Sequence, residues 1–177
     1  MTQRSSGGPL RVGVIGLGDI AQKAYLPVLA ARADVTLTLL GRDNDRLTRI
    51  GRQYGASRCF TRLDDLLDSG VDVAFVHTTT EAHFGLVEQL LSAGIHVLVD
   101  KPLAPSFADA RHLVDLAERQ ERSLAVGSTA ASHRHTRLWL CWTGRLSSCR
   151  RTGLVCRTSR AAWCSTTSFT SLTHCVS

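Results

Sequence analysis

The fold of this 177-residue chain is decided by the stretch Arg11-Val-Gly-Val-Ile-Gly-Leu-Gly-Asp-Ile-Ala21. Residues 12–15 are apolar and predict a buried strand, and the residues after the glycines predict a helix. Between the two, Gly16, Gly18 and Ala21 form G-x-G-x-x-A, a pattern typical of dinucleotide-binding turns. The first glycine allows a tight bend, the second lets backbone approach a pyrophosphate, and the alanine lets the helix pack closely on the strand.

The helix that follows this turn would direct its free N–H groups and its positive dipole end at the phosphates. The predicted cofactor contacts in the turn are therefore Gly16, Leu17, Gly18, Asp19, Ile20 and Ala21. Because glycine turns are common, the pattern carries weight only in a strand–turn–helix context.

Strands and helices are predicted to alternate along the chain up to residue 127. The apolar, β-branched runs predict strands over 12–15, 35–40, 57–60, 71–76, 95–99 and 123–126. Periodicity and end signals predict helices over 19–31, 44–54, 61–69, 81–93 and 106–121. This alternation predicts an α/β fold with a doubly wound parallel sheet, a Rossmann fold, and a ligand crevice at the carboxyl ends of its strands.

Four residues give more specific expectations about the helices. Pro27 is expected to bend the first helix, and Gly55 to end the second. Thr61, three residues before Asp64, has the spacing of a capping box, and Ser106 is expected to cap the last helix.

Composition divides the chain near residue 127. Up to that point there are 14 lysines and arginines against 15 aspartates and glutamates, a net charge of −1. Residues 128–177 contain seven arginines, no acidic residue, five of the six cysteines and all three tryptophans. We therefore expect a disordered lead over 1–9, an NAD(P)-binding Rossmann domain over 10–127, and an irregular, non-native and unstructured tail over 128–177.

The end of the second predicted strand bears on the choice of nucleotide. An acidic residue at this position would bond the ribose 2′-hydroxyl of NAD. Here Gly41 stands at that position and Arg42 follows, and a guanidinium can clamp a 2′-phosphate. The sequence favours NADP over NAD. The alternative is that Arg42 is a solvated loop charge and that Asp43 turns inward to serve NAD.

Two further segments resemble one family. His77-Thr-Thr-Thr-Glu-Ala-His83 follows the fourth predicted strand, and Ala93-Gly-Ile-His-Val-Leu-Val-Asp-Lys-Pro-Leu103 spans the fifth. In this order, over residues 11–127, the chain resembles the Gfo/Idh/MocA oxidoreductases, with their T-P-x-x-x-H-like and A-G-x-H-V-x-x-E-K-P-L segments. Asp100 replaces the family's usual glutamate, and Thr79 stands where proline is common.

The resemblance implies hydride transfer to or from a sugar or polyol-type substrate. It implies that Lys101 reaches the nicotinamide and substrate and stabilises charge on a carbonyl oxygen or relays its proton. The alternative is a surface lysine paired with Asp100. The further cofactor-binding residues that it implies are Thr78, His83, Asp100, Lys101 and Pro102, although a lone histidine such as His83 is as often structural. His77 and His96 are expected to be packing residues.

The family continues after its sixth strand with V-G-x-N-x-R-F and a second domain that supplies a catalytic histidine. Here Gly127 is followed by Ser-Thr-Ala-Ala-Ser. With Gly127 included, this run can be encoded by GGG TCA ACC GCC GCT TCG, and one restored T then gives GGG TTC AAC CGC CGC TTC, or G-F-N-R-R-F. With suitable third bases, residues 163–174 read in the same shifted frame as V-F-D-D-F-I-H-V-V-D-T, similar to the family's histidine segment. We therefore hypothesise a frameshift near residue 127.

Other functions of the tail are disfavoured. Arginines with tryptophans could bind nucleic acid, but no motif orders them, and the cysteines lack C-x-x-C spacing, so no metal site is predicted. A disulfide scaffold would need an oxidising compartment that nothing else indicates. The apolar runs are strand-sized and no leader is visible, so we expect a cytoplasmic protein without membrane contact. Oligomerisation is not expected without the second domain.

Two function hypotheses follow from the sequence. One is the dinucleotide-binding half of an oxidoreductase, inactive as printed because of the frameshift. The other is a nucleotide-binding module or redox sensor without catalysis.

Overall fold

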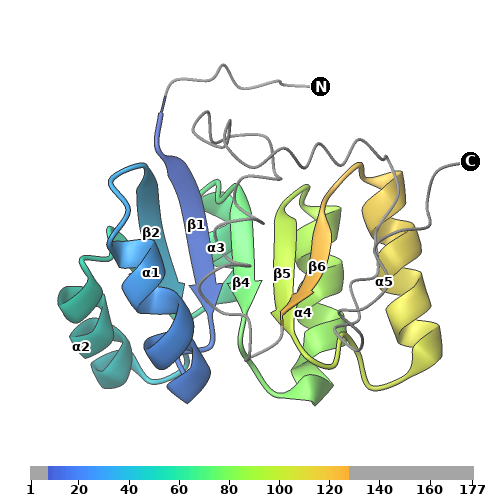
Figure 1. Ribbon diagram of the computed structural model, residues 1–177, viewed down its shortest axis with the longest axis horizontal. Coiled ribbons are helices and arrows are strands. Elements are labelled where there is room, and N and C mark those ends of the chain that lie inside the picture. Colours follow the sequence, from blue (N-terminus) through green and yellow to red (C-terminus); the bar gives the residue numbers. More distant parts are fainter. Residues whose placement is uncertain (1–7, 128–177) are drawn as a thin grey trace, which may run out of the picture.

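The computed structural model describes residues 8–127 as one parallel sheet of six strands flanked by helices (Figure 1). The strand order is β3-β2-β1-β4-β5-β6, and every neighbouring pair is parallel. The strands are β1 (Leu10–Ile15), β2 (Val35–Leu40), β3 (Arg58–Phe60), β4 (Val73–Val76), β5 (His96–Asp100) and β6 (Leu124–Gly127). The helices are η1 (Ala21–Tyr25), α1 (Leu26–Ala30), α2 (Asn44–Tyr54), α3 (Leu63–Asp68), α4 (Thr80–Ser92) and α5 (Phe107–Arg119). The predicted doubly wound α/β fold is confirmed.

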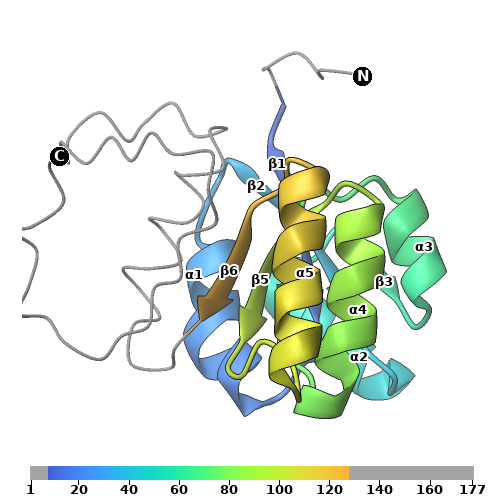
Figure 2. The ribbon, with the colours of Figure 1, turned by 90° about the vertical axis from the view of Figure 1, so that its right-hand side faces the viewer.

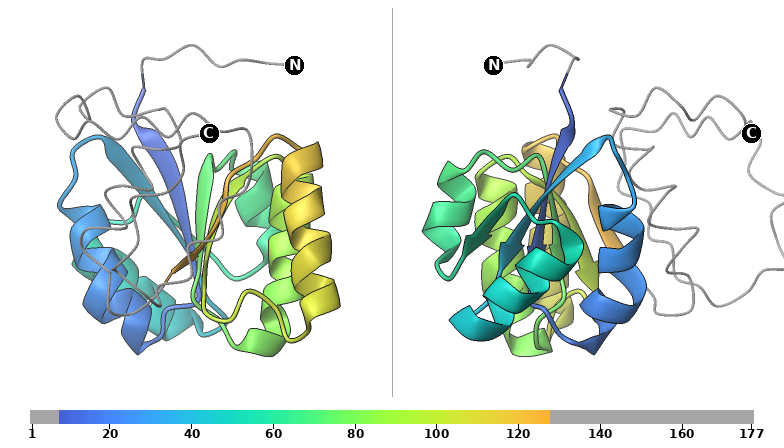
Figure 3. Two further views of the ribbon diagram at one scale, coloured as in Figure 1. Left: turned by 45° about the vertical axis from the view of Figure 1, so that its right-hand side comes forward. Right: turned by 90° about the vertical axis from the view of Figure 1, so that its left-hand side faces the viewer.

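Helices cover both faces of the sheet because its central strands are apolar on both sides. In β4, Val73 and Phe75 pack with η1, α1 and α2, whereas Ala74 and Val76 pack with α3, α4 and α5. Figure 2 views the sheet from the β6 edge and shows α1 on one side and α4 and α5 on the other. The two layers are also visible in both views of Figure 3. The near-continuous apolar strands of the sequence are thus those of a sheet buried on both faces.

The strand order reverses direction between β1 and β4. β1 pairs with β2 on one side and with β4 on the other, and its last residue, Ile15, aligns with Leu40 and Val76. The carboxyl ends of these three strands are therefore level at the switch point, where doubly wound sheets bind ligands.

The helix expected over 19–31 has an unexpected first part. Residues Ala21–Tyr25 form a π-helix, and the α-helix proper is Leu26–Ala30. Pro27 lies in the first turn of α1, where its missing N–H costs nothing, so the change of helix type and the proline coincide.

The end signals of the other helices were mostly right. Gly55 follows α2 with φ +65°, and Ser106 caps α5 by accepting a 3.1 Å hydrogen bond from the Asp109 N–H. The capping box expected at Thr61 is wrong. The N-cap of α3 is Arg62, and no side chain caps that helix, because the chain turns helical one residue later than the Thr–Asp spacing requires.

The predicted lead and tail lie almost wholly outside the described residues, which begin at residue 8 and end at 127. Within 8–127, no helix combines the length and the apolar character needed to cross a membrane.

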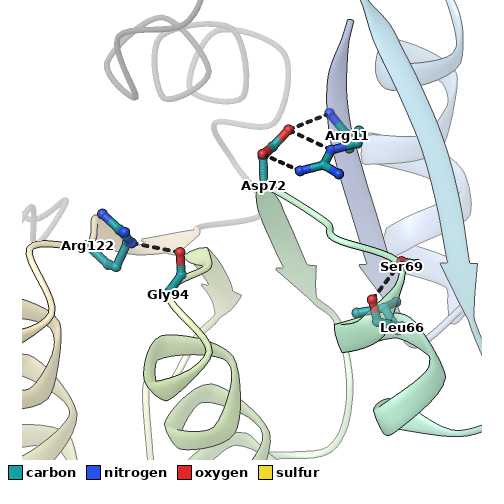
Figure 4. A network of polar contacts seen from close by, with 6 residues as sticks. All are labelled: Arg11, Leu66, Ser69, Asp72, Gly94 and Arg122. Carbon is teal, nitrogen blue, oxygen red and sulfur yellow. Dashed lines mark hydrogen bonds and ion pairs between the residues drawn. The ribbon is translucent and has the colours of Figure 1, made fainter. Parts of the chain in front are cut away.

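Polar contacts hold the amino ends of the central strands together (Figure 4). The Arg11 side chain donates two hydrogen bonds to the Asp72 carboxylate, at 2.9 and 3.2 Å, and its backbone N–H donates a third. The hydrogen bond with Asp72 is the main reason why the pKa of the Arg11 guanidinium is raised. Nearby, the Arg122 guanidinium donates to the Gly94 carbonyl over 2.6 Å. These contacts join β1 to β4 and the segments before β5 and β6, at the edge opposite to the switch point.

We predict that Asp72→Ala lowers the free energy of unfolding of the chain by about 2 kcal/mol, because it leaves a partly buried guanidinium and a backbone N–H without their acceptor. Asp64→Ala is the control, since it removes an exposed ion pair with Arg62 of similar length and should cost less than about 1 kcal/mol. Urea denaturation measures both. Equal losses in the two variants would contradict the structural weight given to Asp72.

Candidate functional site

The bend after β1 depends on Gly16, which has φ +86°. Its N–H donates to the Leu40 carbonyl at the end of β2 over 3.1 Å. A Cβ on Gly16 would collide with the carbonyl oxygen of His77 and lie 2.8 Å from its carbonyl carbon, just after β4. Only glycine fits between the two strand ends in this conformation.

The second glycine leaves the turn open on its outer side. Gly18 is exposed, and a Cβ placed on it would meet no atom within 4 Å. Ala21 is fully buried, so the helix packs closely against the core as the fingerprint requires. Asp19 and Ile20 are exposed, and a 2.8 Å contact with Lys23 lowers the pKa of the Asp19 carboxyl.

The first helical residues are tied to the turn by its carbonyl groups. Leu17, whose side chain is buried, accepts hydrogen bonds through its carbonyl oxygen from Gln22 Nε2 and from Arg46 Nη2, each at 2.8 Å. Arg46 lies in the first turn of α2, so this bond joins two strand–helix connections that are 29 residues apart. Sequence reasoning missed Arg46. Its only signal is its place three residues after an N-cap.

After β2, Arg42 is exposed, whereas the side chain of Asp43 caps the helix that follows. Gly41 lies beneath Leu17, with 3.4 Å between an added Cβ and Leu17 Cδ1, and Arg42 is exposed. Asp43 is the N-cap of α2, and its Oδ1 accepts a 3.0 Å hydrogen bond from the Arg46 N–H. The carboxylate after β2 is therefore engaged by the helix that it starts.

His83 joins the segments that follow β4 and β5. It is 1% exposed, with Nδ1 at 2.8 Å from the Pro102 carbonyl oxygen and Nε2 at 3.2 Å from the Thr78 carbonyl oxygen. Because a neutral imidazole has a single N–H, it can donate to only one of these carbonyls at a time. The structure thus places His83 beneath the candidate site, where it braces the backbone.

Asp100 and Lys101 end β5 and differ sharply in their surroundings. Asp100 Oδ2 lies 2.8 Å from His77 Nδ1, and the two side chains are 18% and 1% exposed. Lys101 and Pro102 are exposed. Within residues 8–127, the partner of Asp100 is therefore His77 and not Lys101. His96 lies elsewhere, and its Nδ1 accepts from the Ser123 N–H over 3.0 Å.

The residues at this edge fit a dinucleotide. The backbone is open at Gly18, and an exposed guanidinium and an exposed ammonium, from Arg42 and Lys101, flank it on either side along the sheet. Two buried polar atoms, His77 Nε2 and Thr78 Oγ1, have no hydrogen-bond partner in the described part of the chain. Buried polar groups normally have partners, so these two atoms leave hydrogen-bonding capacity at the carboxyl end of β4 that a bound group can use.

Comparison with known proteins gives the family. Residues 10–128 match the model of an oxidoreductase family with an NAD-binding Rossmann fold, GFO_IDH_MocA. The chain belongs to the Gfo/Idh/MocA oxidoreductase family. Its described domain is the dinucleotide-binding half of such an oxidoreductase, as the resemblance of its motifs indicated.

Among relatives of this Gfo/Idh/MocA chain, YceM of Salmonella typhimurium is 44% identical over 121 residues, which cover 67% of this chain and 38% of YceM. GenD2 from gentamicin A biosynthesis, solved with NAD, is 33% identical with a TM-score of 0.64 and covers 70% of this chain and 35% of its own. KijD10, a 3-ketoreductase from Actinomadura kijaniata solved with NADP and TDP-benzene, is 29% identical with a TM-score of 0.64. The match covers 76% of this chain and 43% of KijD10. This chain spans about two fifths of the length of these proteins or less.

We predict that Gly16→Ala lowers the free energy of unfolding by at least about 2 kcal/mol, since the new methyl group strains φ and meets backbone atoms of His77. Gly55→Ala has a similar φ of +65° but open space around the new Cβ, and should cost about 1 kcal/mol. Thermal or urea unfolding compares the two. If Gly16→Ala were no more damaging than Gly55→Ala, the close fit of the turn against His77 would be refuted.

Proposed function

We propose that residues 10–127 bind NADP in preference to NAD, and that the intact enzyme transfers hydride to or from a sugar or polyol-type substrate. The observation that carries this proposal is the convergence on one sheet edge of the open turn at Gly18, the exposed Arg42 and the exposed Lys101.

The turn from Gly16 to Ala21 would hold the pyrophosphate. Its backbone approach is open at Gly18, and the amino end of the helix that follows can offer backbone N–H groups to an anion. Arg46, which donates to the Leu17 carbonyl, fixes the distance between this turn and the first turn of α2.

Arg42 would receive the 2′-phosphate of NADP. Gly41 offers no carboxylate to the ribose, and the nearest acid, Asp43, is engaged in capping α2. A guanidinium matches a phosphate with two parallel charge-assisted hydrogen bonds, an interaction that NADH lacks. That GenD2 was solved with NAD and KijD10 with NADP is compatible with either choice within the family.

We predict that the chain binds NADPH more tightly than NADH, and that Arg42→Ala weakens NADPH binding about tenfold or more, the effect of losing about 1.4 kcal/mol of charge-assisted bonding. NADH binding should change little. Isothermal titration calorimetry with both nucleotides measures the four dissociation constants.

Arg49→Ala is the matched control, because Arg49 is an exposed arginine on α2 that does not follow directly after a strand. It should leave both affinities unchanged. Tighter binding of NADH by the native chain, or an equal loss of both nucleotides in Arg42→Ala, would overturn the preference for NADP.

Lys101 is the residue that we assign to the chemistry. When bound, the nicotinamide supplies or accepts the hydride. The Lys101 ammonium, at the end of β5, would then stabilise negative charge on the substrate oxygen or hold the proton that this oxygen gains or loses. The exposure of Lys101, and the pairing of Asp100 with His77, support a lysine that is available to substrate.

For the substrate, the family indicates only a class. KijD10 is a 3-ketoreductase, and we infer that a carbonyl or hydroxyl group of a sugar or polyol is also the reacting group here.

For the chain as printed, we propose that nucleotide binding occurs without turnover. The family match ends at residue 128, where the composition changes. A choice of codons exists for which a one-base shift at this point gives family-like sequence. The alternative is a nucleotide-binding module or redox sensor that never catalyses. The segment Asp100-Lys-Pro102, which resembles the family's E-K-P, favours the enzyme.

We predict that the coding DNA opens a long reading frame when one base is restored near the codon of Gly127. The frame-restored protein should oxidise or reduce a sugar or polyol with NADP(H), while the 177-residue form binds NADPH without turnover. A panel of sugars and polyols, assayed at 340 nm, compares the two. Activity of the 177-residue form, or the lack of any longer frame, would refute the frameshift.

A further inference from the structure

A buried polar cluster lies beneath Lys101. His77 Nδ1 contacts Asp100 Oδ2 at 2.8 Å, and the ring of Tyr25, which is 2% exposed, lies 4.2 Å from the His77 ring between centroids. The other carboxylate oxygen, Asp100 Oδ1, would be 3.6 Å from a Cβ on Gly127, at the end of β6. Asp100 Oδ2 is thus directed into the protein, and Oδ1 lies beside Gly127.

The charge of Asp100 also affects the pKa of the neighbouring Tyr25. Burial, and then the charge of Asp100, raise the pKa of Tyr25 to about 12. The carboxylate therefore acts on the face of the sheet that packs against η1.

The His77–Asp100 contact fixes the tautomer of the imidazole. A carboxylate only accepts hydrogen bonds, so His77 Nδ1 must carry the hydrogen, and in the neutral ring Nε2 has a bare lone pair. This agrees with the lack of a partner for Nε2 within residues 8–127. His96 provides the opposite case, because its Nδ1 accepts from the Ser123 N–H and its hydrogen must lie on Nε2.

We propose that His77 is a positioning residue for Lys101: by holding the Asp100 carboxylate inward, it keeps that carboxylate from pairing with the neighbouring ammonium. Successive side chains of a strand point to opposite faces, which already separates the two at the end of β5. Asp100 is nevertheless 18% exposed and Lys101 has a flexible four-carbon stem, so a carboxylate without its buried donor can rotate toward the ammonium.

The catalytic importance of a free Lys101 rests on the proposed function, but the positioning by His77 does not. It can be tested in the 177-residue chain without nucleotide or substrate, so its failure and the failure of nucleotide binding are distinguishable. The chain has only two lysines, Lys23 and Lys101, which makes a direct comparison possible. Lys23 is exposed and already paired with Asp19 at 2.8 Å.

The measurement is the rate at which each lysine is acetylated by an N-hydroxysuccinimide ester at fixed pH, followed by mass spectrometry. In His77→Leu, which lacks the donor, acetylation of Lys101 relative to Lys23 should fall about threefold, as expected when an exposed ion pair forms. His77→Asn should retain the native ratio, since its amide nitrogen is as many bonds from the backbone as Nδ1. This rescue separates positioning from the loss of a ring.

A double variant tests whether the effect passes through Asp100. In His77→Leu/Asp100→Asn there is no carboxylate to release, so the fall in Lys101 acetylation should disappear. An unchanged or higher ratio in His77→Leu, an equal fall in His77→Asn, or a fall that persists in the double variant would each overturn the proposal.

Long-range ¹H–¹⁵N spectra of the native chain give a test that does not require any variant to fold. The proposal requires a His77 ring protonated on Nδ1 with a bare Nε2, and the spectra should show His96 in the opposite tautomer. A His77 ring protonated on Nε2 alone would overturn it.

Discussion

The close approach of Gly16 to the carbonyl of His77 is the constraint on which the carboxyl edge of the sheet depends. Ile15 aligns with both Leu40 and Val76, so the chain leaves β1 directly between two strand ends. Any side chain on Gly16 would push the turn away from β4. Because the turn is pressed inward at this glycine, it leaves its outer side free at Gly18, where a phosphate group can approach the backbone.

His77 serves this edge with both its backbone and its side chain. Its carbonyl limits the Gly16 turn, and its imidazole holds Asp100 at the end of β5. His83 adds a second brace, between the carbonyls of Thr78 and Pro102. The segments after β1, β4 and β5 are therefore joined by buried contacts, while the residues with exposed charge, such as Lys101, remain at the surface. This arrangement suits a binding site in which buried contacts fix the backbone and the protein's charged side chains remain accessible to a ligand.

The parts that could be predicted from the sequence are those that local patterns determine. Apolar strands buried on both faces, the positive φ of Gly55 and the cap at Ser106 follow from residue type and spacing. The π-helix over 21–25 and the cap of α3 could not be predicted, because their geometry depends on how each helix is seated against the sheet. The fingerprint turn was identifiable because each of its small residues has a geometric role.

Long-range polar contacts could not be predicted either, because they too depend on tertiary packing. Nothing in the sequence joins Arg46 to Leu17, or shows that Asp100 would pair with His77 and not with its neighbour Lys101. These contacts depend on which strand ends lie side by side, which only the strand order β2-β1-β4-β5 specifies.

The central claim is that this edge of the sheet receives a nicotinamide dinucleotide. Hydrogen–deuterium exchange of the 177-residue chain with and without saturating NADPH tests it most directly, because exchange is resolved along the sequence. We expect slower exchange in segments 16–21, 41–46, 77–83 and 100–102, and no change at the amino ends of the strands around Arg11 and Asp72. Protection elsewhere, or none at residues 16–21, would contradict it.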